Sequence, residues 1–142
     1  KWLRKHASQG NSEAMLQLGG AYFAGGFGLD QSTAAAFSFY EKAALQGHVR
    51  AMAVTGSCYA FGDGIGVDRK KAALWYRKAA LQGHPNAQFN LGAALSGGIG
   101  VAQDHGEAVE WYKRAAAQGS QQAQYNLQVC LARGEGVAQD DA

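Results

Sequence analysis

Two histidines and two cysteines occupy matching positions in the sequence, so metal binding and thiol chemistry are the first chemistries to consider. His48 and His84 are 36 residues apart, and Cys58 and Cys130 are 72 residues apart. Neither histidine has a second ligand at helical spacing, and the sequence contains no HExxH or CxxC motif. We therefore expect no metal site and no cofactor. The histidines are expected to begin helices, with metal binding as the distant alternative.

Signals for nucleophilic and phosphate-binding chemistry are weaker still. Ser57 and Ser96 are candidate nucleophiles, but no pattern places a histidine or an acid to activate them. The segment 62–66 reads Gly-Asp-Gly-Ile-Gly, yet no strand is predicted before it and no Gly-Lys-Ser/Thr follows it. We therefore expect a protein without catalytic activity. A hydrolase built around Ser57, His48 or His84 is the alternative.

The composition limits both size and partners. The chain has 142 residues, which suits one domain, and 13 basic against 11 acidic residues give a net charge of +2. So small a charge provides no field that would steer the chain toward nucleic acid or a membrane. No run of 18 apolar residues occurs, so no segment is expected to insert into a bilayer. Lys1 lies inside a helix-like motif and Ala142 follows a turn signal, so we expect the chain to be a piece of a longer repeat array. The sequence carries no information on the cellular compartment.

The chain repeats itself with a period of 36 residues. Phe39, Trp75 and Trp111 each open a nearly identical ten-residue segment, and Trp2 opens a partial copy. A fixed period of this length indicates stacked helical units, each too small to bury its own apolar face. We predict an all-α fold of helix–turn–helix units in a single repeat domain, residues 1–142. The end of a preceding repeat spans 1–13, full repeats span 14–50, 51–86 and 87–122, and a partial repeat spans 123–142.

A glycine recurs in the middle of the first helix of each full repeat, at Gly19, Gly56 and Gly92. Glycine costs roughly 1 kcal/mol relative to alanine inside a helix, so its recurrence requires a compensating benefit. The benefit we expect is the close approach of the second helix. A side chain at position 92 would then displace Trp111 or Ala108.

Turn and cap residues also recur with the repeat. Glycine pairs are expected to end the first helices at Gly26/Gly28, Gly62/Gly64, Gly98/Gly100 and Gly134/Gly136. An apolar residue after each pair is expected to plug the turn into the core, that is, to bury its side chain there: Leu29, Ile65, Val101 and Val137. Predicted caps of the first helices are Asn11, His48, His84 and Ser120, and those of the second helices are Ser32, Asp68, Asp104 and Asp140. Asp104 and Glu107 have the spacing of a capping box.

The two cysteines lie at equivalent positions two repeats apart. Stacked helix layers are separated by about 8–10 Å each, which puts Cys58 and Cys130 beyond the roughly 7 Å Cα separation that a disulfide allows. We therefore expect small buried thiols.

The repeated pattern A-x-x-x-L-G-x-x-Y-x-x-G-x-G-V-x-x-D-x-x-K-A-x-x-W-Y-x-K-A-A-x-Q-G resembles the Sel1-like repeat, a relative of the tetratricopeptide repeat. Repeat 51–86 matches it at Ala51, Gly56, Tyr59, Gly62, Gly64, Ile65, Asp68, Lys71, Ala72, Trp75, Tyr76, Lys78, Ala79, Ala80, Gln82 and Gly83. The departures include Thr55 for leucine, and Phe39 for tryptophan. The resemblance implies a right-handed α/α superhelix whose first helices line a concave face. It also implies adaptor or scaffold roles in protein complexes, mostly without enzymatic activity.

The concave face is the candidate binding site. Counting from the leading alanines, its residues are Glu13, Leu16 and Phe23; Arg50, Ser57 and Phe61; Asn86, Phe89, Asn90 and Ser96; and Gln122, Tyr125, Asn126 and Arg133. Aromatic residues interleaved with amides and arginines suit an extended peptide or a partner protein. The alternative is that Phe23, Phe61, Phe89 and Tyr125 only pack against neighbouring repeats. A third hypothesis is self-association through exposed repeat ends.

Overall fold

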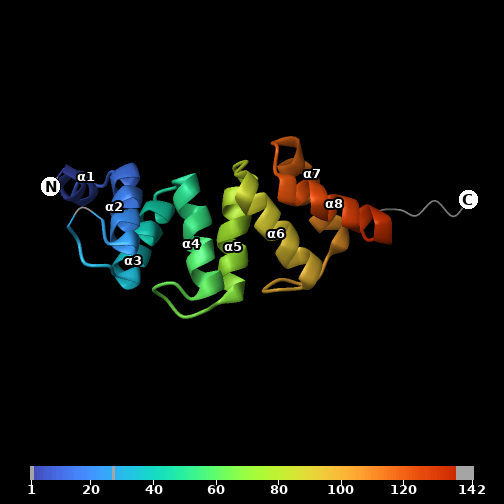
Figure 1. Cartoon of the computed structure of the whole chain (residues 1–142), viewed down its shortest axis with the longest axis horizontal. Coiled ribbons are helices and arrows are strands. Elements are labelled where there is room, and N and C mark those ends of the chain that lie inside the picture. Colours follow the sequence, from blue (N-terminus) through green and yellow to red (C-terminus); the bar gives the residue numbers. More distant parts are fainter. Residues whose placement is uncertain (1, 27, 137–142) are drawn as a thin grey trace, which may run out of the picture. The chain divides into compact units, whose positions relative to one another are not determined.

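The computed structural model describes residues 2–26 and 28–136, and these residues form helices and turns without any strand (Figure 1). The helices within these ranges are α1 (Trp2–Ser8), α2 (Ser12–Ala24), α3 (Thr33–Leu45), α4 (Val49–Phe61), α5 (Arg69–Leu81), α6 (Pro85–Gly97), α7 (His105–Ala117) and α8 (Gln121–Arg133). All except α1 have 13 residues. The predicted all-α repeat fold is confirmed.

The chain divides into two compact units, residues 1–75 and 76–142, and the division falls inside α5. In unit 1, α2 packs against both α1 and α3, and α3 packs against α4. In unit 2, α7 packs against both α6 and α8. Each unit therefore contains at least one helix pair in which the first and second helices of a repeat meet, α2 with α3 and α6 with α7.

The first helices begin as the sequence predicts. Each cap residue accepts a hydrogen bond from the backbone N–H of the leading alanine, three residues further on, and so satisfies a donor that the helix cannot. The donor–acceptor pairs are Ala14 N to Asn11 Oδ1 (2.9 Å), Ala51 N to His48 Nδ1 (3.3 Å), Ala87 N to His84 Nδ1 (3.2 Å) and Ala123 N to Ser120 Oγ (3.2 Å).

The second helices are capped in the same way by Ser32, Asp68 and Asp104, whereas the predicted cap Asp140 lies outside the described residues. The capping box predicted at Asp104 forms only in part. Glu107 donates its backbone N–H to Asp104 Oδ1 at 3.0 Å, but its carboxylate bonds to other side chains.

The first helices end at left-handed glycines, with one correction to the prediction. Gly62, Gly98 and Gly134 are the C-caps of α4, α6 and α8. In the first repeat the C-cap is Gly25, at φ 73°, and not the predicted Gly26. The turn of that repeat is one residue longer, so an alignment on the glycine pairs shifts the cap by one position.

The recurring mid-helix glycine is explained by a tyrosine of the partner helix. A Cβ on Gly19 would lie 2.7 Å from Cε1 of Tyr40, and a Cβ on Gly92 would lie 2.7 Å from Cε1 of Tyr112. Both distances are well below the 3.5–4.0 Å of an ordinary carbon contact. The close approach is confirmed at Gly19 and Gly92. Of the two neighbours predicted for Gly92, Ala108 is confirmed, because its backbone oxygen would lie 3.3 Å from the Cβ, whereas Trp111 is wrong because the ring over Gly92 is that of Tyr112.

The second glycine has a different role in two of the pairs, Gly62/Gly64 and Gly134/Gly136, where it joins the turn to the preceding second helix, whereas a Cβ on Gly28 would meet no atom of another described residue within 4 Å beyond its chain neighbours. A Cβ on Gly64 would overlap the carbonyl group of Thr33 at the start of α3, and one on Gly136 would overlap that of His105 at the start of α7. Both glycines also have positive φ, 77° and 72°. A side chain is therefore disfavoured by strain as well as by space.

The core consists largely of alanine, which allows the helices to approach closely. The four leading alanines, Ala14, Ala51, Ala87 and Ala123, are fully buried. Thr55, which replaces the leucine of the repeat, is also fully buried, and its hydroxyl has no hydrogen-bond partner among the described residues.

Both cysteines are buried and free, as expected. Burial, together with the nearby charge of Asp63, raises the pKa of the Cys58 thiol to about 11.

Candidate functional site

Unit 2 contains a cleft of about 500 Å³ where the start of α6 faces the turn between α7 and α8. Its walls are polar but uncharged. The lining residues are Pro85, Asn86, Gln118, Gly119, Ser120, Gln121 and Gln122. Two of them, Asn86 and Gln122, belong to the face predicted from the sequence.

One side of the cleft is held by a chain of amide hydrogen bonds. Nε2 of Gln118 donates to the backbone oxygen of Gly83 at 2.9 Å and to Oε1 of Gln88 at 3.0 Å. Gln88 is only 4% exposed, and its own Nε2 donates to the backbone oxygen of Ala80 at 3.2 Å. Because Gln118 is bonded to one backbone oxygen and to a buried amide that is itself bonded to a second one, it forms a fixed wall.

Three other side-chain amides of the cleft are uncommitted, which here means that they form no hydrogen bond with a described residue. Asn86, Gln121 and Gln122 are exposed, and no described residue forms a hydrogen bond with their side chains. A side-chain amide offers both donors and an acceptor. These are the groups needed to pair with the N–H and C=O groups of a peptide backbone.

An exposed aromatic ring extends this face. Tyr125 follows Gln122 by three residues on α8, so the two side chains are neighbours on the helix surface. Tyr125 is 67% exposed. An exposed ring that can hold an apolar side chain therefore lies on the same helix as part of the polar lining of the cleft.

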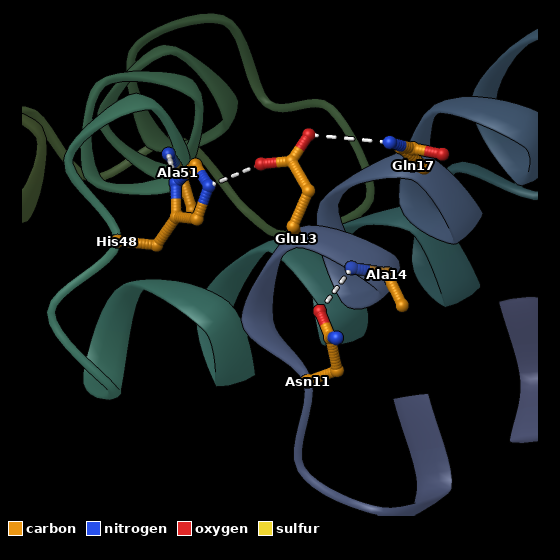
Figure 2. A network of polar contacts seen from close by, with 6 residues as sticks. All are labelled: Asn11, Glu13, Ala14, Gln17, His48 and Ala51. Atoms are coloured by element: carbon orange, nitrogen blue, oxygen red, sulfur yellow. Dashed lines mark hydrogen bonds and ion pairs between the residues drawn. The ribbon is translucent and has the colours of Figure 1, made fainter. Parts of the chain in front are cut away.

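In unit 1 the equivalent position is bridged by a hydrogen bond between a histidine and a carboxylate. Glu13 corresponds to Asn86 in the repeat, and His48 corresponds to Ser120. Figure 2 shows Nε2 of His48 directed at Oε2 of Glu13, at 2.7 Å, while Oε1 of Glu13 accepts from Gln17 at 3.2 Å. The hydrogen bond with His48 is the main cause that lowers the pKa of Glu13, with a smaller contribution from Gln17. This bridge links the start of α2 to the start of α4.

The same geometry defines the chemistry of His48. Its Nδ1 accepts the N–H of Ala51, so in the neutral ring Nε2 carries the proton and donates it to Glu13. Both ring nitrogens are occupied in this arrangement. An imidazole held in this way has no free lone pair with which to take a proton from a nucleophile.

Unit 1 places the predicted face residues in different environments. Leu16 is buried at 6% exposure, so its prediction as a surface residue is wrong: in this repeat the position belongs to the packed interior. Ser57 is half-buried, and Arg50 is exposed. Phe23 and Phe61 are 40% and 74% exposed, so packing leaves much of both rings in contact with solvent.

In unit 2 some predicted residues have structural partners. The half-buried ring of Phe89 lies 5.9 Å from that of Tyr112, and Asn126 donates to the hydroxyl of Tyr112 at 3.4 Å. Tyr112 belongs to the same repeat as Phe89, so this ring contact is packing within a repeat and not the predicted packing against a neighbouring one. Asn90 and Ser96 are half-buried, whereas Arg133 is exposed.

Sequence reasoning missed most of the cleft. Gln118, Gly119 and Ser120 lie in the turn between α7 and α8, and Gln121 is the first residue of α8, so none of them lies on the helix face from which the prediction was counted. A signal was nevertheless present, because residues 120–122 read Ser-Gln-Gln and follow the Gln-Gly pair that ends the second helix of each repeat. Among the described residues, no group of three His, Cys, Asp or Glu side chains could hold a metal ion.

Comparisons with known proteins identify the repeat. The family model of the Sel1 repeat matches residues 12–48, 49–84, 85–120 and 121–142. The chain belongs to the Sel1 repeat family. Sel1 repeats are commonly protein–protein interaction modules, and the family is generally non-catalytic. No curated protein matches the sequence.

Solved structures agree that the chain consists of Sel1 repeats. A protective antigen present in uropathogenic Escherichia coli strains, described as displaying an SLR fold, is 39% identical with a TM-score of 0.92; the match covers 96% of this chain and 29% of that one. A Sel1 repeat protein from Oxalobacter formigenes is 35% identical with a TM-score of 0.88, over 94% of this chain and 55% of that one. The Helicobacter pylori cysteine rich protein B shares the fold at 23% identity and a TM-score of 0.69, over 88% and 94% of the two chains. The chain thus spans only about a third to a half of the first two neighbours.

Proposed function

We propose that this chain is a protein-interaction scaffold or adaptor that binds an extended peptide segment of a partner protein in the α6–α8 cleft. The observation that carries the proposal is the set of three uncommitted amides, Asn86, Gln121 and Gln122, around a cleft of about 500 Å³. The fixed Gln118 supplies one rigid wall, and Tyr125 supplies an apolar contact beside the amides. A rigid site loses little conformational entropy when a peptide binds.

The chemistry of the lining also indicates what kind of ligand is suited to the cleft. Its side chains carry no charge, so they distinguish ligands by hydrogen bonding and shape. An extended backbone presents alternating donors and acceptors, which paired amides can match. None of the described helices is long and apolar enough to cross a membrane.

Site-specific photo-crosslinking tests the proposal. A photoreactive amino acid at position 122 should capture partner peptides from a lysate of the source organism, whereas the same group at position 128 should not. Gln128 is a matched control because it is an exposed glutamine on the same helix, α8, but does not line the cleft. Mass spectrometry of the adducts would identify the partner sequence.

A binding measurement with the identified peptide completes the test. The double variant Asn86→Ala and Gln122→Ala should bind at least about tenfold more weakly, and Gln128→Ala should bind like the parent, while circular dichroism stays unchanged for all three. Equal crosslinking at positions 122 and 128, or full binding by the double variant, would show that the cleft is not the binding site.

A further inference from the structure

The turn between α4 and α5, in unit 1, exposes a group of apolar side chains. Phe61 is 74% exposed, Val67 is 54% exposed and Ile65 is 38% exposed. The sequence predicts that Ile65 plugs the turn into the core, and its exposure shows that this prediction is wrong. Its counterparts Leu29 and Val101 are at least half-buried, whereas Val137 lies outside the described residues.

Three exposed basic residues follow directly and form the first turn of α5. Positive side chains at a helix N-terminus oppose the helix dipole, so this placement weakens the helix that carries them. The equivalent turns of the other described second helices contain no lysine or arginine. The first turn of α5 reads Arg69-Lys70-Lys71, whereas the first turn of α3 reads Thr33-Ala34-Ala35 and that of α7 reads His105-Gly106-Glu107.

The basic residues are not neutralised by neighbours of opposite charge. No described carboxylate forms an ion pair with Arg69 or Lys70. Lys71 places its Nζ 5.5 Å from the centre of the Tyr59 ring. Arg69 and Lys70 therefore keep their charge available to a partner.

The turn that carries these side chains is well supported by backbone contacts. The N–H groups of Gly62 and Asp63 both donate to the backbone oxygen of Cys58, at 2.8 and 3.0 Å, and the N–H of Asp68 donates to that of Tyr59 at 2.9 Å. Gly64 rests against Thr33 of α3 without room for a side chain. The surface is therefore formed before any partner binds, which favours affinity.

We propose that residues 61–71, which we name the apolar–basic loop, dock an acidic segment of a partner protein. The partner segment would place an aliphatic or aromatic side chain against Phe61 and Ile65, and carboxylates against Arg69 and Lys70. Aromatic residues and arginines are enriched at protein interfaces and at their hot spots. The charge of the loop selects the acidic partner.

A protein partner fits the loop better than an anionic bilayer does. The same segment contains Asp63 and Asp68, which leave it with a net charge of only +1 against its three basic residues. A uniformly anionic surface would repel these two carboxylates, whereas a protein can place its own acidic groups against Arg69 and Lys70 alone. The apolar–basic loop belongs to unit 1 and the amide cleft to unit 2, so the two proposals can fail separately.

A display experiment tests the proposal without a known partner. A random-peptide library would be selected on the immobilised chain and counter-selected on the triple variant Phe61→Ser, Arg69→Ser and Lys70→Ser. We expect enriched peptides that combine several Asp or Glu residues with an aliphatic or aromatic residue. In fluorescence polarisation, these peptides should bind the triple variant at least about tenfold more weakly, and added salt should weaken binding to the parent.

A control variant and a vesicle assay make the outcome decisive. Ile99→Ser removes a 48% exposed apolar side chain from the equivalent turn of unit 2, which no basic triplet follows, and it should leave peptide binding unchanged. Enriched peptides without an acidic excess, or with equal affinity for the triple variant, would overturn the proposal. So would the absence of peptide binding together with loop-dependent sedimentation on vesicles of phosphatidylcholine and phosphatidylserine, because that result would assign the loop to a membrane surface.

Discussion

Replacing Gly20 by alanine should stabilise unit 1, whereas the same change at the adjacent Gly19 should leave its stability level or lower it. Both glycines lie inside α2 (Ser12–Ala24), where alanine improves helix propensity by about 1 kcal/mol. A Cβ on Gly19 would lie 2.7 and 2.8 Å from two ring carbons of Tyr40 and 3.2 Å from the backbone oxygen of Ala36. A Cβ on Gly20 would meet only the Tyr40 hydroxyl, at 3.8 Å, which is an ordinary contact.

The magnitude follows from the inability of the ring to move away. Tyr40 is 7% exposed, so it can relieve the overlap only by disturbing its packing. Overpacking of this kind typically costs about 1–3 kcal/mol. Because the gain in propensity is the same at the two positions, the difference in unfolding free energy between the two variants measures the overlap alone. We expect that difference to be about 1–3 kcal/mol, with Gly19→Ala the less stable variant.

Urea unfolding followed by circular dichroism provides the measurement. The midpoint should rise for Gly20→Ala and stay level or fall for Gly19→Ala, with little change in slope. Gly92→Ala should behave like Gly19→Ala, since its Cβ would lie 2.7 Å from Tyr112. If Gly19→Ala raised the midpoint as much as Gly20→Ala, the close-approach explanation of the repeat glycine would be refuted.

Three further predictions concern single buried or paired side chains. Thr55→Val removes a fully buried hydroxyl that has no partner among the described residues, and it should raise the unfolding free energy by about 1 kcal/mol; a loss of stability would mean that the hydroxyl is satisfied. Arg77 donates to Glu107 at 2.6 Å and, with Trp111, lowers the pKa of that carboxyl. The pair therefore stabilises the fold above the ordinary pKa of glutamate, and this contribution is lost as the pH falls through the lowered value. Since both side chains are about a third exposed, Glu107→Gln should cost only about 0.5 kcal/mol at pH 7 and nothing at pH 2, as measured by urea midpoints at the two pH values. Cys58, whose pKa is raised to about 11 by burial, should resist alkylation by iodoacetamide at pH 8 until urea unfolds the chain; rapid labelling of the native chain would contradict its burial.

The helices and their caps could be predicted from the sequence because they depend on residues only a few positions apart. A cap such as His48 bonds to the N–H three residues ahead, so its identity and its place before a leading alanine are sufficient. The 36-residue period then predicts the stacking, since each repeat must bury the same apolar positions. The error at Gly25 has the same local origin, because one inserted turn residue moves the cap relative to the glycine pair.

Contacts between helices were decided only by the tertiary structure. The sequence indicates that some ring must approach Gly92, but Trp111 and Tyr112 are adjacent, and the rotation of α7 about its axis selects Tyr112. Leu16 and Tyr125 occupy the same repeat position, yet one is buried and the other exposed, so repeat position alone does not determine burial.

The candidate site follows the same division. Asn86 and Gln122 could be predicted from their helix face, whereas Gln118 enters the cleft from a turn whose direction no periodicity encodes. The sequence therefore determined the repeat, its helices and the residues that begin and end them, because these rest on local hydrogen bonds and a repeated apolar pattern. Only the tertiary structure decided which side chains meet and which remain exposed, because that depends on how the helices rotate and pack against one another.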